Sequence, residues 1–332
     1  MCAPSSSWPK AEETTSENEV VTRIYDVRDL LHRRPDFPAP KLGLGGVEPA
    51  AETEDWGEAS WTMEELVEWV ERILEEDLKV AGGQVRSFRK QLVISLPARS
   101  QERVTTALKG ARDRGRAAFT IEANLWTVND TEMSEWFPGK RSSRRSRVLS
   151  PADARSLTAK MAGSPSASPI ENPRLGVFAY QRAHFVVLDQ KAYVDRFEIG
   201  ESGEPTEPVV DLLSTGVTLE ARVLPRRQRP GIILEWDVRV AYPVSPEEPD
   251  GGEPELAVPE IVTVSREGRS ALKKGELLVI RGLPEPSGDV EGEETILVLS
   301  CLATPMPGGL PESSPPEEKS EPSTKERRAS GR

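Results

Sequence analysis

Residues that commonly perform catalysis or bind metals are few and widely spaced in this sequence. There are two histidines, His32 and His184, and two cysteines, Cys2 and Cys301, which lie at opposite ends of the chain. These spacings fit neither a CxxC metal site nor a disulfide framework, and they give no support for a Ser-His-Asp arrangement. The pattern therefore indicates a non-enzymatic protein that uses no metal or cofactor.

Two further segments have only a partial likeness to site motifs. The acidic run at residues 54–58 holds several carboxylates, but paired catalytic acids are defined by geometry, and a solvated surface is the simpler interpretation. The glycines at residues 42–46 do not have the GxGxxG or GxxxxGK[ST] spacing of a phosphate-binding loop. A turn is expected there.

Cys2 is a candidate site of lipid attachment. A mature bacterial lipoprotein begins with a cysteine followed by small residues and a polar tether, and residues 2–7, CAPSSS, fit that form. The lipid would tether the chain to a membrane; the alternative is an incidental cysteine. The sequence contains no apolar run of about 18 residues. Residues 1–10 also lack the regions of a signal peptide, so the chain as written is expected in the cytoplasm.

A basic cluster interrupts a chain whose net charge is -12. An acidic protein of this kind is not expected to bind nucleic acid as a whole. The cluster could dock an acidic partner or lipid head groups, and the alternative is a solvated connector. Its members are Lys140, Arg141, Arg144, Arg145 and Arg147.

An amphipathic helix is predicted after residue 62. Thr62 and Glu65 have the spacing of a capping box, and an apolar stripe recurs at helical spacing through Leu66, Val70 and Ile73. Trp69 lies off this stripe. It is therefore a candidate interface anchor, unless it packs beneath the Pro-rich connector at residues 35–50.

The helix begins a small α+β unit, and a long series of strands follows it. Residues 61–114 are predicted to form helix, strand, strand and helix, with Leu92, Ile94, Val104 and Leu108 inside. Alternating residues predict a half-buried strand at 119–129 and an antiparallel sheet or sandwich from residue 173 onward. The fold class is α+β. The expected divisions are a tether (1–19), an N-terminal segment and connector (20–60), the module (61–115), a β-rich domain (116–305) and a disordered tail (306–332).

Four segments, in this order, resemble the secretins of bacterial secretion and pilus systems. VTRIYDVRDLL (21–31) is similar to the YDVRDLL-type opening of their N-terminal region, and GGQVRSFRKQLVISLP (82–97) with the helix after it resembles the ring-building N-domain. FTIEANLWTVN (119–129) resembles the strand that opens the secretin domain. SPIENPRLGVF (168–178), followed by LLSTGVTLEARVLP (212–225), resembles the later strands of that domain.

The resemblance implies an oligomeric scaffold in the periplasm or at the periphery of the outer membrane, whose partner is itself or another secretin-like protein. A pore requires amphipathic hairpins. Residues 129–150 are mostly polar and basic, and residues 197–209 are charged without a strand pattern. The chain is therefore expected to lack the pore-forming hairpins. The alternative is a monomeric or dimeric module that binds a peptide by strand addition.

Overall fold

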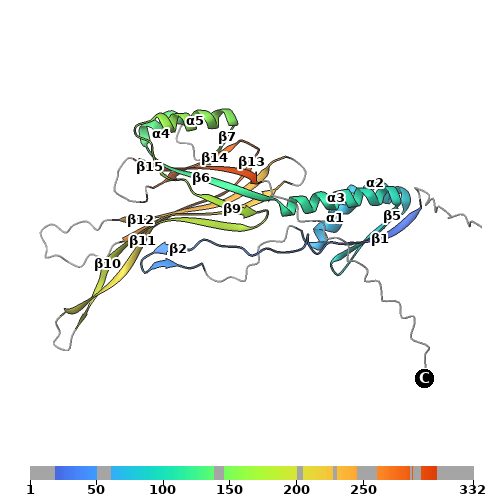
Figure 1. Cartoon of the computed structure of the whole chain (residues 1–332), viewed down its shortest axis with the longest axis horizontal. Coiled ribbons are helices and arrows are strands. Elements are labelled where there is room, and N and C mark those ends of the chain that lie inside the picture. The colour runs from blue at the N-terminus through green and yellow to red at the C-terminus, as the bar shows by residue number, and fades with distance from the viewer. Residues whose placement is uncertain are drawn as a thin grey trace, which may run out of the picture.

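The computed structural model places two folded units side by side along the length of the molecule (Figure 1). It describes residues 19–50, 61–137, 146–199, 205–226, 230–244, 260–284, 286 and 293–304. The fold class is α+β, as the sequence predicted.

The first unit is a three-stranded antiparallel sheet covered by helices. The strand order is β1 (Val20–Asp26), β5 (Gln91–Pro97) and β4 (Gln84–Phe88). The helices are α1 (Met63–Ile73), α2 (Glu75–Ala81) and α3 (Ala98–Arg116). Thr62 and Glu65 form the predicted capping box at the start of α1. The sequence placed residues 20–31 in a separate segment, whereas the structure pairs β1 with β5 in the sheet of this unit.

Most residues predicted for its interior are buried, with one difference. Ile73 is only half-buried, whereas Leu74, where α1 ends, is fully buried. Helix α3 begins at Ala98 and buries Ser100 within its first turn. Leu66, Val70, Leu92, Ile94, Val104 and Leu108 are buried as expected.

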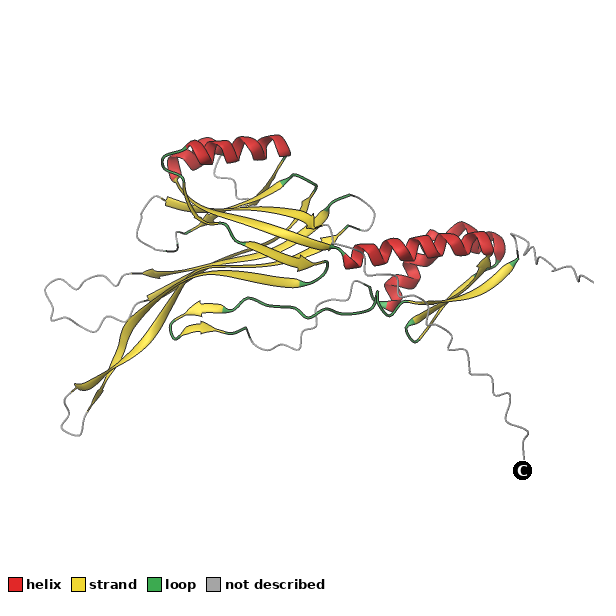
Figure 2. Ribbon diagram, in the orientation of Figure 1, coloured by secondary structure: helices red, strands yellow, loops and turns green. Residues whose placement is uncertain are grey.

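The second unit is a sandwich of two antiparallel sheets (Figure 2). One sheet has the order β10 (Arg182–Ile199), β11 (Pro205–Pro225), β12 (Ile232–Val244) and β13 (Glu260–Leu272). The other contains β7 (Ser146–Leu149), β14 (Leu277–Leu283), β15 (Glu293–Thr304), β6 (Ala118–Asn129) and β8 (Ser168–Glu171), and β9 (Arg174–Phe178) also pairs with β6. A single apolar core fills the space between the sheets, with Leu125, Leu219, Leu234 and Leu278 fully buried.

A third layer covers the other face of the second sheet. It consists of α4 (Asp130–Trp136) and α5 (Pro151–Gly163), which enclose a smaller core around Met133, Leu157 and Met161. Ser150 caps α5, since its hydroxyl accepts a hydrogen bond from the amide of Asp153. Helix α4 and strands β7 and β8 were not predicted.

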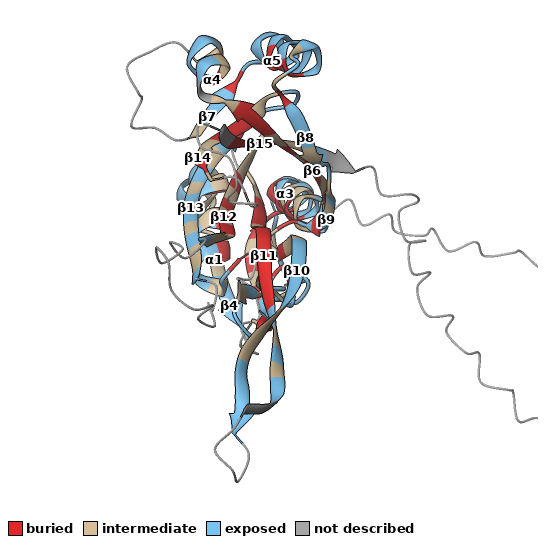
Figure 3. Ribbon diagram, turned by 90° about the vertical axis from the view of Figure 1, so that its left-hand side faces the viewer, coloured by how far each residue is buried: buried red, intermediate tan, exposed pale blue. Residues whose placement is uncertain are grey.

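The described parts of the charged stretch, residues 197–199 and 205–209, belong to strands, which corrects the expectation from sequence. Strand β10 runs to Ile199, and β11 begins at Pro205. The two pair in one ladder, with register shifts after Val194 and after Phe197. This end of the hairpin is largely exposed on both faces, so polar residues can belong to strands there (Figure 3).

The first unit gives a direct test of its core. Ile94→Asp places a carboxylate at a fully buried position between β1 and β4, and an unpaired buried charge should cost several kcal/mol. Its thermal transition should fall strongly. Ile24→Asp is the matched control, because Ile24 lies on the same sheet and is 64% exposed. Equal melting of the two variants would contradict the assignment of Ile94 to the core.

Candidate functional site

The four-stranded sheet carries its most unusual chemistry on the face opposite the sandwich core. Alternate residues of a strand point to opposite faces, so while Leu219, Ala221 and Val223 enter the core, their neighbours form charged rows across the sheet. The register sets one row as Arg182, Arg222, Glu235 and Arg269. The next row is His184, Glu220, Asp237 and Glu267.

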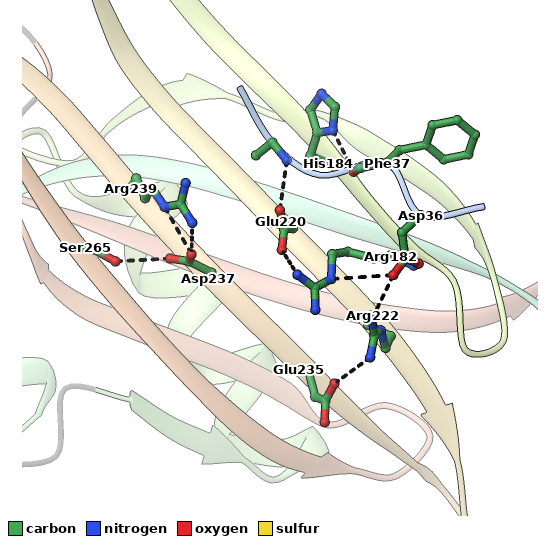
Figure 4. A network of polar contacts seen from close by, with 11 residues as sticks. Asp36, Phe37, Arg182, His184, Glu220, Arg222, Glu235, Asp237, Arg239 and Ser265 are labelled. Carbon is green, nitrogen blue, oxygen red and sulfur yellow. Dashed lines mark hydrogen bonds and ion pairs between the residues drawn. The ribbon is translucent and has the colours of Figure 1, made fainter. Parts of the chain in front are cut away.

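An extended segment crosses the β10–β11 half of these rows (Figure 4). We call residues 34–40, RPDFPAP, the strap. The Asp36 carboxylate accepts a hydrogen bond from Arg222 Nη2 at 2.9 Å, and the Arg182 guanidinium lies 3.9 Å from it. The Asp36 and Arg222 side chains are each only 8% exposed. Charges removed from water to this extent are tolerated because they are paired.

The strap also binds the backbone of the outer strand. The amide of Arg182 donates to Asp36 Oδ1 at 2.7 Å, and its carbonyl accepts from the amide of Phe37 at 2.9 Å. The carbonyl of Phe37 lies 2.9 Å from His184 Nδ1, and the amide of Ala39 donates to Glu220 Oε2 at 2.8 Å. Both backbone groups of Arg182 at the sheet edge are therefore satisfied by the strap.

The hairpin that follows the strap lies over β11. Strands β2 (Lys41–Gly43) and β3 (Gly46–Glu48) pair with each other, and Leu44 forms an isolated antiparallel bridge with Leu213. Gly45 and Gly46 form the turn with φ of +83° and +93°, values that L side chains rarely adopt. The turn of the hairpin therefore lies along the edge of β11 beyond Gly216, where β12 no longer pairs with it.

The β12–β13 half of the charged face is open. A groove of about 580 Å³ extends from there across β11 to Arg182 of β10, with Trp236 and Gly268 among its lining residues. Its charges are already matched, since Arg269 lies 3.4 Å from Glu235 and Arg239 pairs with Asp237. Such a balanced surface suits contact with another polypeptide better than capture of a small ion.

The described residues show no arrangement typical of catalysis. They contain no cluster of three or more His, Cys, Asp or Glu residues able to hold a metal. His184 binds the strap, and His32 lines a small cavity of about 50 Å³ beside α3. Burial raises the pKa of the Cys301 thiol to about 12, which disfavours the nucleophilic thiolate. Within the same ranges, none of the helices is long and apolar enough to cross a membrane.

The site residues predicted from sequence are not brought together. Cys2, Lys140, Arg141, Arg144 and Arg145 lie outside the described residues. Arg147 is exposed on β7, where it lines a groove with Trp136, Phe137 and Lys160.

Trp69 is half-buried and packs against the core of the first unit. Its ring centroid lies 4.9 Å from that of Trp61. Part of the ring remains accessible, so its role as an interface anchor stays a prediction.

Sequence reasoning missed the strap and its partners. The prolines at 35, 38 and 40 were interpreted only as a connector, and Asp36 was not singled out. The strand sequences did contain an indication of a charged face. Charged residues alternate with apolar ones there, namely Glu220 and Arg222 in one strand and Glu235, Asp237 and Arg239 in the next. Fully solvated strands use such charges too, so the pattern does not by itself reveal a covering segment.

Removing the Asp36 carboxylate should destabilise the sandwich. Asp36→Ala leaves Arg222 buried with its nearest anionic partner lost, and breaking a buried pair costs about 3 kcal/mol or more. Urea unfolding should show this loss, whereas Asp26→Ala, at an exposed pair with Arg28, should change stability little. A strap that contributes nothing would make the two variants equally stable.

The Cys301 thiol should be unreactive in the folded protein. In a Cys2→Ser variant at pH 8, a thiol reagent should react slowly before unfolding in urea and quickly afterwards, because burial keeps the pKa far above its ordinary value of 9.0. Stability should fall as the pH rises above 9, since the unfolded thiol ionises first. Rapid labelling of native protein would place Cys301 in solvent.

No family model and no curated protein matches this chain. Among solved structures, it is similar to the type II secretin XcpQ from Pseudomonas aeruginosa (13% identity, TM-score 0.35, 90% of this chain and 77% of that chain). It is also similar to the InvG secretin domain from Salmonella (10%, 0.31, 89% and 91%) and to the PilQ secretin of V. cholerae (11%, 0.29, 87% and 79%). All three are secretins, the family that the sequence motifs resemble. TM-scores this low leave the function to be argued from the chain's own contacts.

Proposed function

We propose that this protein is a non-enzymatic scaffold that associates with copies of itself in a bacterial envelope assembly. The observation that supports this proposal is the four-stranded sheet β10-β11-β12-β13, in which all neighbouring strands are antiparallel. Because the number of strands is even, β10 and β13 run in opposite directions. A second copy can therefore place its β13 beside β10 and continue the antiparallel pattern without turning over.

The backbone groups that such pairing would use can be assigned. Arg182 directs its amide and carbonyl away from β11, toward the strap. Hydrogen-bonding direction alternates along an antiparallel strand, and the ladder from Arg182 to Val194 has no interruption. Even-numbered residues of β10 therefore present amides and carbonyls at the open edge of the sheet.

The envelope location rests on the secretin resemblance, and the membrane tether rests on Cys2 alone. A lipid on Cys2 would hold the scaffold at a membrane surface while the folded units associate. The exposed Arg147, with the basic residues before it in the sequence, would then face an acidic partner or anionic head groups.

We do not assign a pore to this scaffold. Beneath and beside the strap, the outward face of the sheet holds Arg182, Glu220, Glu235 and Arg269. Charged side chains of this kind do not suit contact with lipid. Purified protein in planar bilayers should give no conductance steps. Regular steps would show that the hairpin β10–β11 inserts.

The observed edge allows a sharp test of self-association. Ala192→Pro removes one outward amide of β10 without touching the ladder to β11, and proline is tolerated at such edge positions. It should lower the average mass measured by light scattering, whereas Ala192→Gly, which keeps the amide, should not. A wild-type chain that stays monomeric or dimeric at all concentrations would instead favour a binding module that adds a peptide strand at the same edge.

A further inference from the structure

We propose that the strap restricts which part of β10 a second copy can use, so that docking occurs on the outer part of the β10–β11 hairpin, from Val186 to Val194. This inference rests on the proposed self-association and assigns its location. Two independent features support it: the strap blocks one end of the edge, and the other end carries an exposed apolar surface.

The blocked end is at Arg182 and His184. The strap uses the outward amide and carbonyl of Arg182 and places the Phe37 carbonyl against His184. An incoming strand would need the same amide and carbonyl of Arg182 for its own hydrogen bonds. The strap cannot itself continue the sheet, because Pro35, Pro38 and Pro40 have no amide to donate.

The open end carries exposed apolar residues on the same face, on both sides of the hydrogen-bonded pair Gln190 and Ser214. Directly paired residues share a face, so Leu188, paired with Gly216, lies on one side with Ala192 and its partner Leu212. The next pair on this side is Val194 with Val210. Leu188, Leu212 and Val210 are 41%, 43% and 59% exposed. Figure 3 shows this hairpin extending away from the body of the molecule with much of its surface exposed.

The strand that a second copy in the same orientation brings to this edge is β13, the opposite edge of the sheet. Its outer part, Glu260–Val264, reads EIVTV, whereas its inner part holds Arg266, Glu267 and Arg269. Across one sheet, Leu188 is level with Thr263, and His184 is level with Glu267. When copies align side by side, Val264 and Thr263 of one copy therefore meet Val187 and Leu188 of the other. The charged inner part of β13 meets the strap.

The proposal can be tested with cysteine pairs that only two copies can join. Leu188 and Thr263 of one chain are separated by three strand spacings, about 14 Å, which is too far for a disulfide. The same holds for His184 and Glu267. The full-length chain, with Cys2→Ser and Cys301→Ala, would carry either Leu188→Cys with Thr263→Cys or His184→Cys with Glu267→Cys. Neighbouring β13 positions, Ile261→Cys and Ser265→Cys, allow for a stagger of two residues.

On oxidation, the variants with Leu188→Cys and a cysteine on β13 (the outer pairs) should give covalent dimers and higher species. The variant with His184→Cys and Glu267→Cys (the inner pair) should remain monomeric. Phe37→Pro removes the bond to the Arg182 carbonyl without touching a buried charge, and it should make the inner pair cross-link. Phe37→Ala, which keeps the amide, is its control.

Equal cross-linking of the inner pair with the strap intact would overturn the guarding role of the strap. Assemblies in light scattering without any outer cross-link would overturn the docking surface and leave self-association standing. A chain that is monomeric by light scattering and forms no cross-links would overturn both proposals.

Discussion

The buried pair of Asp36 with Arg222 is the interaction on which the sheet's outer face depends. Arg222 stands in the middle of a sheet face, where its neighbour Arg182 on β10 repels it and Glu235 on β12 lies 3.9 Å away. Within the sheet, Glu220 pairs with Arg182 at 3.0 Å, so the buried Arg222 depends on an acidic group from outside the sheet. Asp36 supplies that charge, and the prolines around it hold the strap extended.

This single contact links segments that are far apart in the chain. Residues 34–40 follow β1 of the first unit, yet they bind strands that begin almost 150 residues later. Strand β1 is held by β5, and α3 leads directly into β6 of the sandwich. The chain therefore passes to the sandwich at the strap, returns to the first unit between residues 50 and 61, and passes to the sandwich again at residue 117. Arg34 also connects the strap to the sandwich, because its guanidinium donates a hydrogen bond to the carbonyl of Ala179 at 3.4 Å.

Local patterns predicted the elements well where one face meets an apolar core. The alternation in FTIEANLWTVN gave β6, and the capping box at Thr62 gave the start of α1. The prediction was wrong for residues 197–199 and 205–209, because a strand that is exposed on both faces has no apolar alternation to detect. The strap could not be found either, since its partners are fixed by the register of three strands rather than by nearby residues. The secretin resemblance supplied the expectation of association, while the location of the edge came only from the structure.

Hydrogen exchange on β10 is the most direct test of association through this edge. The outward amides of Val186, Leu188, Gln190 and Ala192 should exchange quickly in dilute protein and become protected as concentration rises, because they would bond to a second copy. Amides of α5, which lies on the far sheet, should not change. Exchange in β10 that is independent of concentration, in samples that light scattering shows to be assembled, would contradict the account.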